Sequence, residues 1–348
     1  MDTEVIKIDP SAIDEAAIRR ASELIKSGDL VVFPTETVYG MGADATNESA
    51  AKKIYEAKGR PSDNPLIIHI ASPEWAEDYA YTNPTYYKLA EKFMPGPLTV
   101  VLGSRETVPL ATRGGLDTVA IRCPSNNVAK ELIRLSGVPI AAPSANLSGS
   151  PSPTRVEHVI DDMLGRVDMI IDGGDCSFGL ESTIVKIDAH DTVTLLRPGK
   201  ITVEDIEALG ITVNVASAVR EELRDGEVAL SPGMKYRHYA PKAPVILIDG
   251  KNTEIAEYIK AESVEPCAFL AFSEDVAFYR EALPAVDVYD FSSKEDVEGQ
   301  AHLLFHILRE MDKKNYRSIF APLPSADGIG LALYNRMIRA AAHKIIKM

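Results

Sequence analysis

The 348-residue sequence has few cysteines, no excess of positive charge and no long hydrophobic run. Its three cysteines, Cys123, Cys176 and Cys267, are odd in number and far apart, which argues against a disulfide framework and excludes a Cys-x-x-Cys metal site. No stretch approaches the roughly 18 apolar residues that a membrane helix needs, and the first residues lack the pattern of a signal peptide. We therefore expect a cytoplasmic protein that does not enter a membrane.

Positive charge is scarce: 37 lysines and arginines face 51 aspartates and glutamates, which gives a formal net charge of -14. Proteins that bind nucleic acid on their own usually present a basic face. The overall field of this chain would repel a polyanion at long range. We therefore expect weak or no direct binding of tRNA or other nucleic acid. Because no heptad repeat or domain-swapping signal is present, we also expect a monomer.

The length exceeds that of one typical domain, so two domains are expected. Strands and helices are mixed without strict alternation in residues 1–210, which predicts an α/β domain with a mixed twisted open sheet. A helix is predicted over residues 11–27, starting near Ser11 and ending at Gly28, where a left-handed C-cap is favoured. Polar loops repeatedly follow strand ends, where open α/β sheets bind ligands.

Residues 243–348 show a more regular pattern of strand followed by helix, which predicts a small Rossmann-like domain with a parallel sheet. The first strand leads to Asp249-Gly250-Lys251 and not to Gly-x-Gly-x-x-Gly, so no dinucleotide site is assigned. The predicted strand and helix pairs are 245–248 with 254–260, 267–271 with 274–281, 286–289 with 294–313, and 318–321 with 330–346.

Residues 211–242 are predicted to form a long linker between the two domains, because residues 231–241 have no apolar period and are bounded by prolines. Ordinary linkers are rich in Gly and Ser or are charged. This one carries two tyrosines, a histidine and two cations within residues 235–239. It is therefore either a packed connector or a functional segment.

Residues 34–70 contain a candidate phosphate site. Lys58 and Arg60 flank Gly59 and precede Pro61, which cannot continue a helix. Two cations spaced in this way can close on one anion. The alternative is a solvated helix end, where cations favour the negative end of the dipole. No Walker A sequence is present, so an ATP site would need another set of phosphate ligands.

Further polar residues follow predicted strands. Ser144 and Asn146 offer neutral donors to phosphate oxygens, although a turn with local Asx bonding is the simpler interpretation. Arg122 ends a short apolar strand and forms either a surface ion pair or a bidentate contact with a substrate carboxylate. His69 follows three aliphatic residues and is either a structural histidine or a substrate contact.

Two other patterns are not assigned chemistry. His302 and His306 lie one helical turn apart but have no third ligand in sequence, so a metal site is not expected there. Cys176 has no adjacent base, so nucleophilic catalysis is not expected.

Six segments in order resemble the threonylcarbamoyl-AMP synthase family, in its long two-domain form with a YrdC-like catalytic domain. Each segment is weak evidence alone, and Met41 departs from the leucine that is common at that position. The segments are Pro34-Thr35-Glu36-Thr37-Val38-Tyr39-Gly40, Lys58-Gly59-Arg60-Pro61, Pro143-Ser144-Ala145-Asn146, Ser182-Thr183-Ile184-Val185, Leu196-Arg197-Pro198-Gly199 and residues 231–239.

The resemblance implies a nucleotidyltransferase that converts L-threonine, bicarbonate and ATP into threonylcarbamoyl-AMP and pyrophosphate. Mg²⁺ would enter with ATP, and no metal site is expected on the protein. The product would pass to the tRNA threonylcarbamoyl transferase machinery for N6-threonylcarbamoyladenosine synthesis.

The same resemblance implies the site residues. For threonine they are Thr35, His69, Arg122, Ser144 and Ser182. For ATP they are Lys58, Arg60, Ser62, Thr118, Ala142, Ser144, Asn146, Arg197 and Tyr236, the last acting as a lid from the linker. Two alternatives remain, an RNA-binding factor and a carbamoyltransferase of the hydrogenase-maturation type. The charge opposes the first, and the absence of Cys-x-x-Cys pairs opposes the second.

Overall fold

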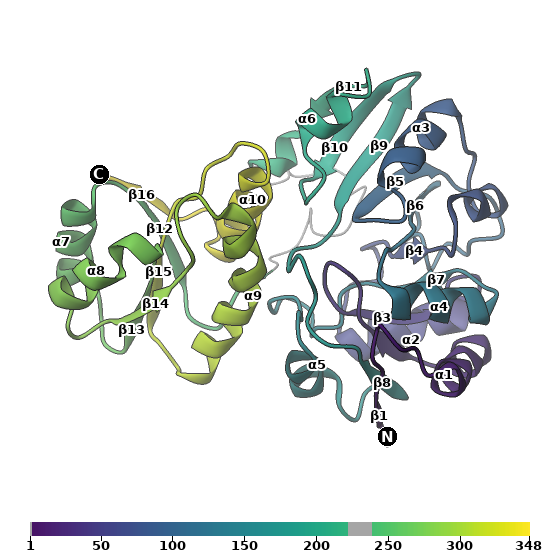
Figure 1. The fold of residues 1–348 in the computed structure, drawn as a ribbon, viewed down its shortest axis with the longest axis horizontal. Coiled ribbons are helices and arrows are strands. Elements are labelled where there is room, and N and C mark those ends of the chain that lie inside the picture. Colours follow the sequence, from purple (N-terminus) through teal and green to yellow (C-terminus); the bar gives the residue numbers. More distant parts are fainter. Residues whose placement is uncertain (1, 222–238) are drawn as a thin grey trace. The chain divides into compact units, whose positions relative to one another are not determined.

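The computed structural model describes residues 2–221 and 239–348 of the chain (Figure 1). The described residues form two compact units, each with its own sheet. One sheet is large and mixed and the other is entirely parallel, which confirms the predicted fold class. The units are unit 1, with residues 2–148, 152–177 and 181–221, and unit 2, with residues 149–151, 178–180 and 239–348.

Unit 1 contains a sheet of eleven strands in the order β1-β8-β2-β3-β7-β4-β6-β5-β9-β10-β11. The sheet is mixed, since β4 is parallel to β6 whereas β5 is antiparallel to β6. The strands are β1 (Glu4–Lys7), β2 (Val31–Phe33), β3 (Gly40–Asp44), β4 (Ile67–His69), β5 (Leu98–Gly103), β6 (Thr118–Arg122), β7 (Ile140–Ala141), β8 (Met169–Asp172), β9 (Thr183–Ala189), β10 (Thr192–Arg197) and β11 (Thr212–Val215).

Six α-helices accompany this sheet in the described part of unit 1: α1 (Glu15–Ser27), α2 (Glu48–Lys58), α3 (Pro84–Phe93), α4 (Asn127–Ser136), α5 (Val156–Met163) and α6 (Val203–Glu207). Helix α1 begins later than predicted, because the side chain of Asp14 and not that of Ser11 caps it, accepting a hydrogen bond from the amide of Ala17. Its predicted end is confirmed, with Gly28 in the left-handed region at φ 78°. Apolar side chains of α1 and α4 share one core with the neighbouring strands.

Strand β3 passes through two glycines, and the sequence reading assigned no strand there. A side chain at Gly42 would place its Cβ 2.6 Å from both Ile140 Cγ2 and Phe33 Cε1. Glycine is therefore required for the close approach of β3 to its neighbours. This packing brings the segment after β2 against the loop after β7.

Unit 2 is a doubly wound domain of five parallel strands in the order β14-β13-β15-β12-β16. Helices α7 and α8 cover one face and α9 and α10 the other (Figure 1). No helix in the described residues is long and apolar enough to cross a membrane. The elements are β12 (Val245–Asp249), α7 (Asn252–Glu262), β13 (Cys267–Ala271), α8 (Val276–Ala282), β14 (Asp287–Asp290), α9 (Val297–Lys313), β15 (Ser318–Pro322), α10 (Gly330–Ala340) and β16 (Ile345–Lys347).

The predicted helix over residues 330–346 is wrong at its end. Helix α10 stops at Ala340, and Ala342 and His343 adopt left-handed φ values of 46° and 59°. The chain then forms β16, in which Ile345 pairs with Leu247 of β12. The pairing with β12 is a contact between residues far apart in sequence, which helical periodicity could not reveal.

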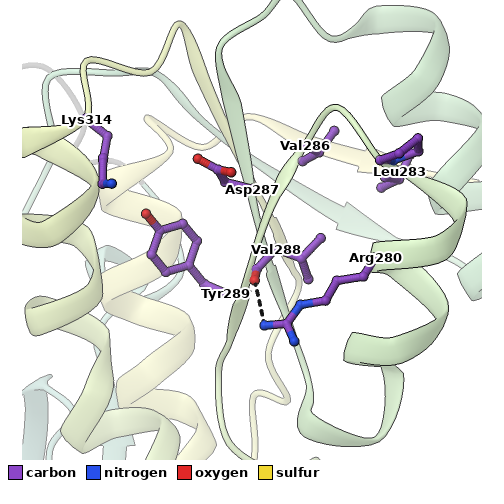
Figure 2. Close-up of a pocket in the computed structure, with 8 residues that line it drawn as sticks. Arg280, Leu283, Val286, Asp287, Val288, Tyr289 and Lys314 are labelled. Atoms are coloured by element: carbon purple, nitrogen blue, oxygen red, sulfur yellow. Dashed lines mark hydrogen bonds between the residues drawn. The ribbon is translucent and has the colours of Figure 1, made fainter.

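Strand β14 lies at an edge of the unit 2 sheet, and a groove of about 390 Å³ runs alongside it (Figure 2). Arg280 donates a 3.5 Å hydrogen bond to the carbonyl oxygen of Val288 on one side of the strand. The side chains of Tyr289 and Lys314 lie on the other side. Charged side chains beside an edge strand oppose its pairing with another chain.

Candidate active site

Five neighbouring strands of the unit 1 sheet carry polar residues at the same end of the strands. His69 ends β4 and Arg122 ends β6, and the two are register partners. Thr99, near the start of antiparallel β5, is also a register partner of Arg122. Ser182 precedes β9, and Arg197 ends β10. Directly opposed residues point to the same face of a sheet, so segments far apart in sequence meet here.

Ser182 and Arg197 form a buried hydrogen-bonded cluster with Thr99. Nη2 and Nε of Arg197 donate to Oγ and to the carbonyl oxygen of Ser182, each at 3.0 Å, and Ser182 Oγ lies 2.8 Å from Thr99 Oγ1. A Cβ at Gly199 would lie 2.4 Å from the amide nitrogen of Thr183, so only glycine allows this approach. Thr99 was not predicted as a site residue, although it is the one polar residue in the apolar run of residues 98–102.

Arg122 is held by Glu36, which the sequence reading did not include among the site residues. Nη2 of Arg122 lies 2.7 Å from a Glu36 oxygen, and the two side chains are only 5% and 12% exposed. The other oxygen of Glu36 accepts the amide of Ser125 at 3.2 Å. The pair is therefore buried, and Nε of Arg122 is a buried donor that has no hydrogen-bond partner among residues 2–221 and 239–348. An unpaired buried donor is costly and is suited to a ligand carboxylate.

His69 is neutral at physiological pH. Burial, with a further effect from the charge of Arg122, lowers its pKa to about 3. Its Nδ1 lies 3.3 Å from the carbonyl oxygen of Ile140, and its ring meets Phe33 edge to face. The hydrogen bond requires the proton on Nδ1, so Nε2 is left as an acceptor.

Replacing His69 by asparagine is expected to flatten the pH dependence of stability. The ordinary pKa of 6.5 falls to about 3 on folding. The unfolded chain therefore binds a proton below pH 6.5 that the folded chain excludes. The contribution of His69 to stability is complete above pH 6.5 and declines by up to about 1.4 kcal/mol per pH unit until pH 3.

Urea unfolding at pH 7.5 and 5.5, followed by the fluorescence of Trp75, measures this effect in unit 1, because Trp75 is the only tryptophan and packs against its core. The wild-type protein should lose about 1 kcal/mol more than the His69→Asn variant between the two pH values. An equal loss in both proteins would contradict a neutral buried imidazole.

Lys58 joins helix α2 to the loop after β7. It is the last residue of α2, its side chain is buried, and Nζ donates to the carbonyl oxygens of Ser144 and Asn146. The amide of Ser148 donates back to the carbonyl oxygen of Lys58 at 3.0 Å. Ser144 Oγ donates to Asn146 Oδ1 within the loop. The structure therefore brings Lys58, Ser144 and Asn146 together.

The next predicted ATP residues lie in three segments: the turn after α2, the residue after β7 and the start of β6. Arg60 donates through Nε to the carbonyl oxygen of Asn64 at 3.2 Å and through Nη2 to that of Pro65 at 3.1 Å. Ser62 is exposed in the same turn. Ala142 follows β7 directly, whereas Thr118 begins β6 at the end opposite Arg122. Thus Lys58 and Arg60 contact different segments of the protein.

The hydroxyl of Thr35 stabilises its own loop, donating to the carbonyl oxygen of Val38 at 2.6 Å and lying 2.8 Å from the hydroxyl of Thr37.

Tyr236, the predicted lid residue, lies outside the described residues. Cys176 is buried, and burial raises the pKa of its thiol, so it remains protonated at neutral pH. In residues 2–221 and 239–348, no group of three His, Cys, Asp or Glu side chains could hold a metal ion.

Comparisons with known proteins cover both units. A family model described as "Telomere recombination" matches residues 23–199, and one described as "Threonylcarbamoyl-AMP synthase, C-terminal domain" matches residues 201–342. The chain is 45% identical over 346 residues to a threonylcarbamoyl-AMP synthase of Pyrococcus abyssi and 42% identical over 343 residues to one of Bacillus subtilis. Each alignment covers 97% of both chains.

Solved structures agree with the sequence comparisons. The crystal structure of P. abyssi Sua5 complexed with L-threonine matches with a TM-score of 0.89 and 42% sequence identity, and the match covers 100% of each chain.

Proposed function

The chain belongs to the threonylcarbamoyl-AMP synthase family, and we propose that it converts L-threonine, bicarbonate and ATP into threonylcarbamoyl-AMP and pyrophosphate. It is a nucleotidyltransferase that serves the N6-threonylcarbamoyl modification of tRNA adenosine.

The proposal is supported above all by the unpaired Nε of Arg122. This buried donor lies at the same end of the strands as neutral His69 and the cluster around Ser182. The carboxylate of threonine would accept from Nε and offset the cost of that buried donor. Nε2 of His69 and the hydroxyl of Ser182 would then contact the polar groups of the amino acid. Thr35 and Ser144 complete the proposed threonine contacts.

The triphosphate of ATP would lie against the loop after β7 and the start of the loop after α2. Lys58 and Arg197 are buried cations, and Ser144 and Asn146 carry neutral polar groups. Arg60, Ser62, Thr118 and Ala142 are the further proposed contacts, with Tyr236 as a cover from the linker. Mg²⁺ would enter bound to the phosphate oxygens of ATP, where it neutralises charge that develops during transfer.

The residues of the candidate active site suit a reaction in which the enzyme acts mainly by positioning its substrates. The amine of threonine and bicarbonate form a carbamate with loss of water, and a carbamate oxygen attacks the α-phosphorus as pyrophosphate leaves. No covalent bond to the enzyme is required, which agrees with the buried, protonated Cys176. Preorganised cations and donors would stabilise the charge on the phosphates.

A pyrophosphate assay tests this function directly. The purified chain with ATP, Mg²⁺, L-threonine and bicarbonate should release pyrophosphate, and omission of any substrate should reduce the rate to background. L-Serine in place of L-threonine tests the choice of amino acid. Release of pyrophosphate without threonine or bicarbonate would overturn the assignment.

We also propose that the protein acts in the cytoplasm as a monomer and passes its adenylate to the tRNA threonylcarbamoyl transferase machinery. All three cysteines are free and buried, which fits a reducing compartment. The net charge of -14 supports transfer without tight binding of tRNA by this chain.

A further inference from the structure

The unit 2 sheet contains a switch point of the kind that binds ligands in open α/β folds. Strands β13 and β15 are neighbours. From β13 the chain continues to β14 on one side, whereas from β15 it continues to β16, beyond β12, on the other side. The two connections leave in opposite directions, so a crevice is expected outside the carboxyl ends of these strands.

A cavity of about 160 Å³ lies at that position. Its walls come from the ends of β12, β13 and β15, the start of α7 and the segments beside α8 and α9. Pockets for drug-sized ligands measure roughly 300–1,000 Å³, so this crevice suits a much smaller molecule than a nucleotide. Its apolar walls include Ile248, Ile255, Phe269, Ala271, Phe272 and Leu323.

Five polar side chains line the crevice, and all of them except Asp249 interact with one another. Asp275 accepts a 2.7 Å hydrogen bond from the side-chain Nδ2 of Asn252 and lies 2.8 Å from Nζ of Lys294. Tyr279, which is buried, donates to the amide oxygen of Asn252 at 3.2 Å. Asp275 is 13% exposed and Lys294 is 48% exposed, so both charges border the cavity and Lys294 is the more exposed of the two.

The chemistry of these groups defines the ligand. A negative and a positive side chain lie within 3 Å of each other beside an apolar wall. An anion alone would face the carboxylates of Asp275 and Asp249, and a cation alone would compete with the ammonium of Lys294 for Asp275. A molecule with an ammonium and a carboxylate on one carbon can pair with both charges. The groove along β14 lacks this convergence, because Arg280 and Lys314 lie on opposite sides of the strand (Figure 2).

We infer that the crevice binds a small aliphatic α-amino acid. Its ammonium pairs with Asp275, its carboxylate pairs with Lys294, and its side chain packs against Phe272 and Leu323. The residues of this site all belong to unit 2, and the inference does not depend on the proposed function.

Calorimetric titration of the full chain with L-alanine, L-valine and L-leucine tests the inference. At least one should bind saturably, and the Asp275→Asn and Lys294→Met variants should each bind it at least tenfold more weakly. Isobutylamine and isovalerate, which are valine without its carboxylate and valine without its ammonium, should bind the wild-type chain at least tenfold more weakly than valine does. Binding should survive in the Arg122→Gln variant, because that change lies in unit 1.

Four results would overturn the inference: no heat from any of the three amino acids at 10 mM, an analogue with one charge that binds as tightly as valine, unchanged affinity in both unit 2 variants, or loss of binding in the Arg122→Gln variant. The pyrophosphate assay on the same samples keeps the two proposals distinct. Threonine-dependent release can succeed while the crevice binds nothing, and the reverse can also occur. The analogue titrations use only wild-type protein, so they remain decisive if a variant fails to fold.

Discussion

Replacement of Arg122 by glutamine is expected to raise the KM for L-threonine roughly 30-fold or more and to leave the KM for ATP nearly unchanged. Truncating one partner of a buried, hydrogen-bonded charge pair costs about 2–5 kcal/mol of binding. The same change leaves Glu36 buried without its cation, which is expected to destabilise unit 1 by about 3–5 kcal/mol. Initial rates of pyrophosphate release measure the first effect, and the fluorescence of Trp75 during urea unfolding measures the second.

The Glu36→Gln variant and the double variant separate these effects. Glu36→Gln should also destabilise unit 1, because Arg122 then lacks its carboxylate. The double variant should recover much of the stability, since neither a carboxylate nor a guanidinium is then left buried without its partner. It should nevertheless retain the high KM for threonine. An unchanged KM in Arg122→Gln would mean that the carboxylate of threonine binds elsewhere.

Replacement of Lys58 by methionine is expected to lower kcat about 100- to 1,000-fold, the effect of removing one preorganised donor from a developing charge. Lys58 is buried, and its ammonium contacts the carbonyl oxygens of Ser144 and Asn146. Methionine preserves the length of the chain but supplies neither the charge nor the hydrogen bonds. The loop after β7 would lose both side-chain hydrogen bonds to α2, together with the cation proposed to lie near the phosphates. Steady-state pyrophosphate release at saturating ATP and threonine provides the measurement.

Lys52→Met is the matched control on the same helix. Lys52 is 61% exposed and pairs with Glu48 one turn earlier, an interaction of the kind that contributes little. Its replacement should leave kcat within about twofold. If Lys58→Met also retained turnover near that of the wild-type protein, Lys58 would have no role with ATP and the phosphate site would have to lie elsewhere.

Several parts of the fold could be predicted because they depend on residues close in sequence. Gly28 ends α1 in a left-handed conformation, as its position after the apolar period indicated. The alternation of strands and helices after residue 243 predicted the parallel sheet of unit 2. Other parts depend on distant pairing. Strand β16 exists because Ile345 pairs with β12, and residues 330–346 alone resemble a continuous helix.

The sequence by itself determined the composition of the candidate site: its cations, its neutral donors and its lack of a nucleophile with a base. Only the tertiary structure decided how they meet. Strand order brings Thr99 beside Ser182, Glu36 to Arg122 and Lys58 to the carbonyl oxygen of Ser144. Local interactions determine caps and turns within a few residues. The order of strands follows from burial of the whole sheet, which no short segment of the chain encodes.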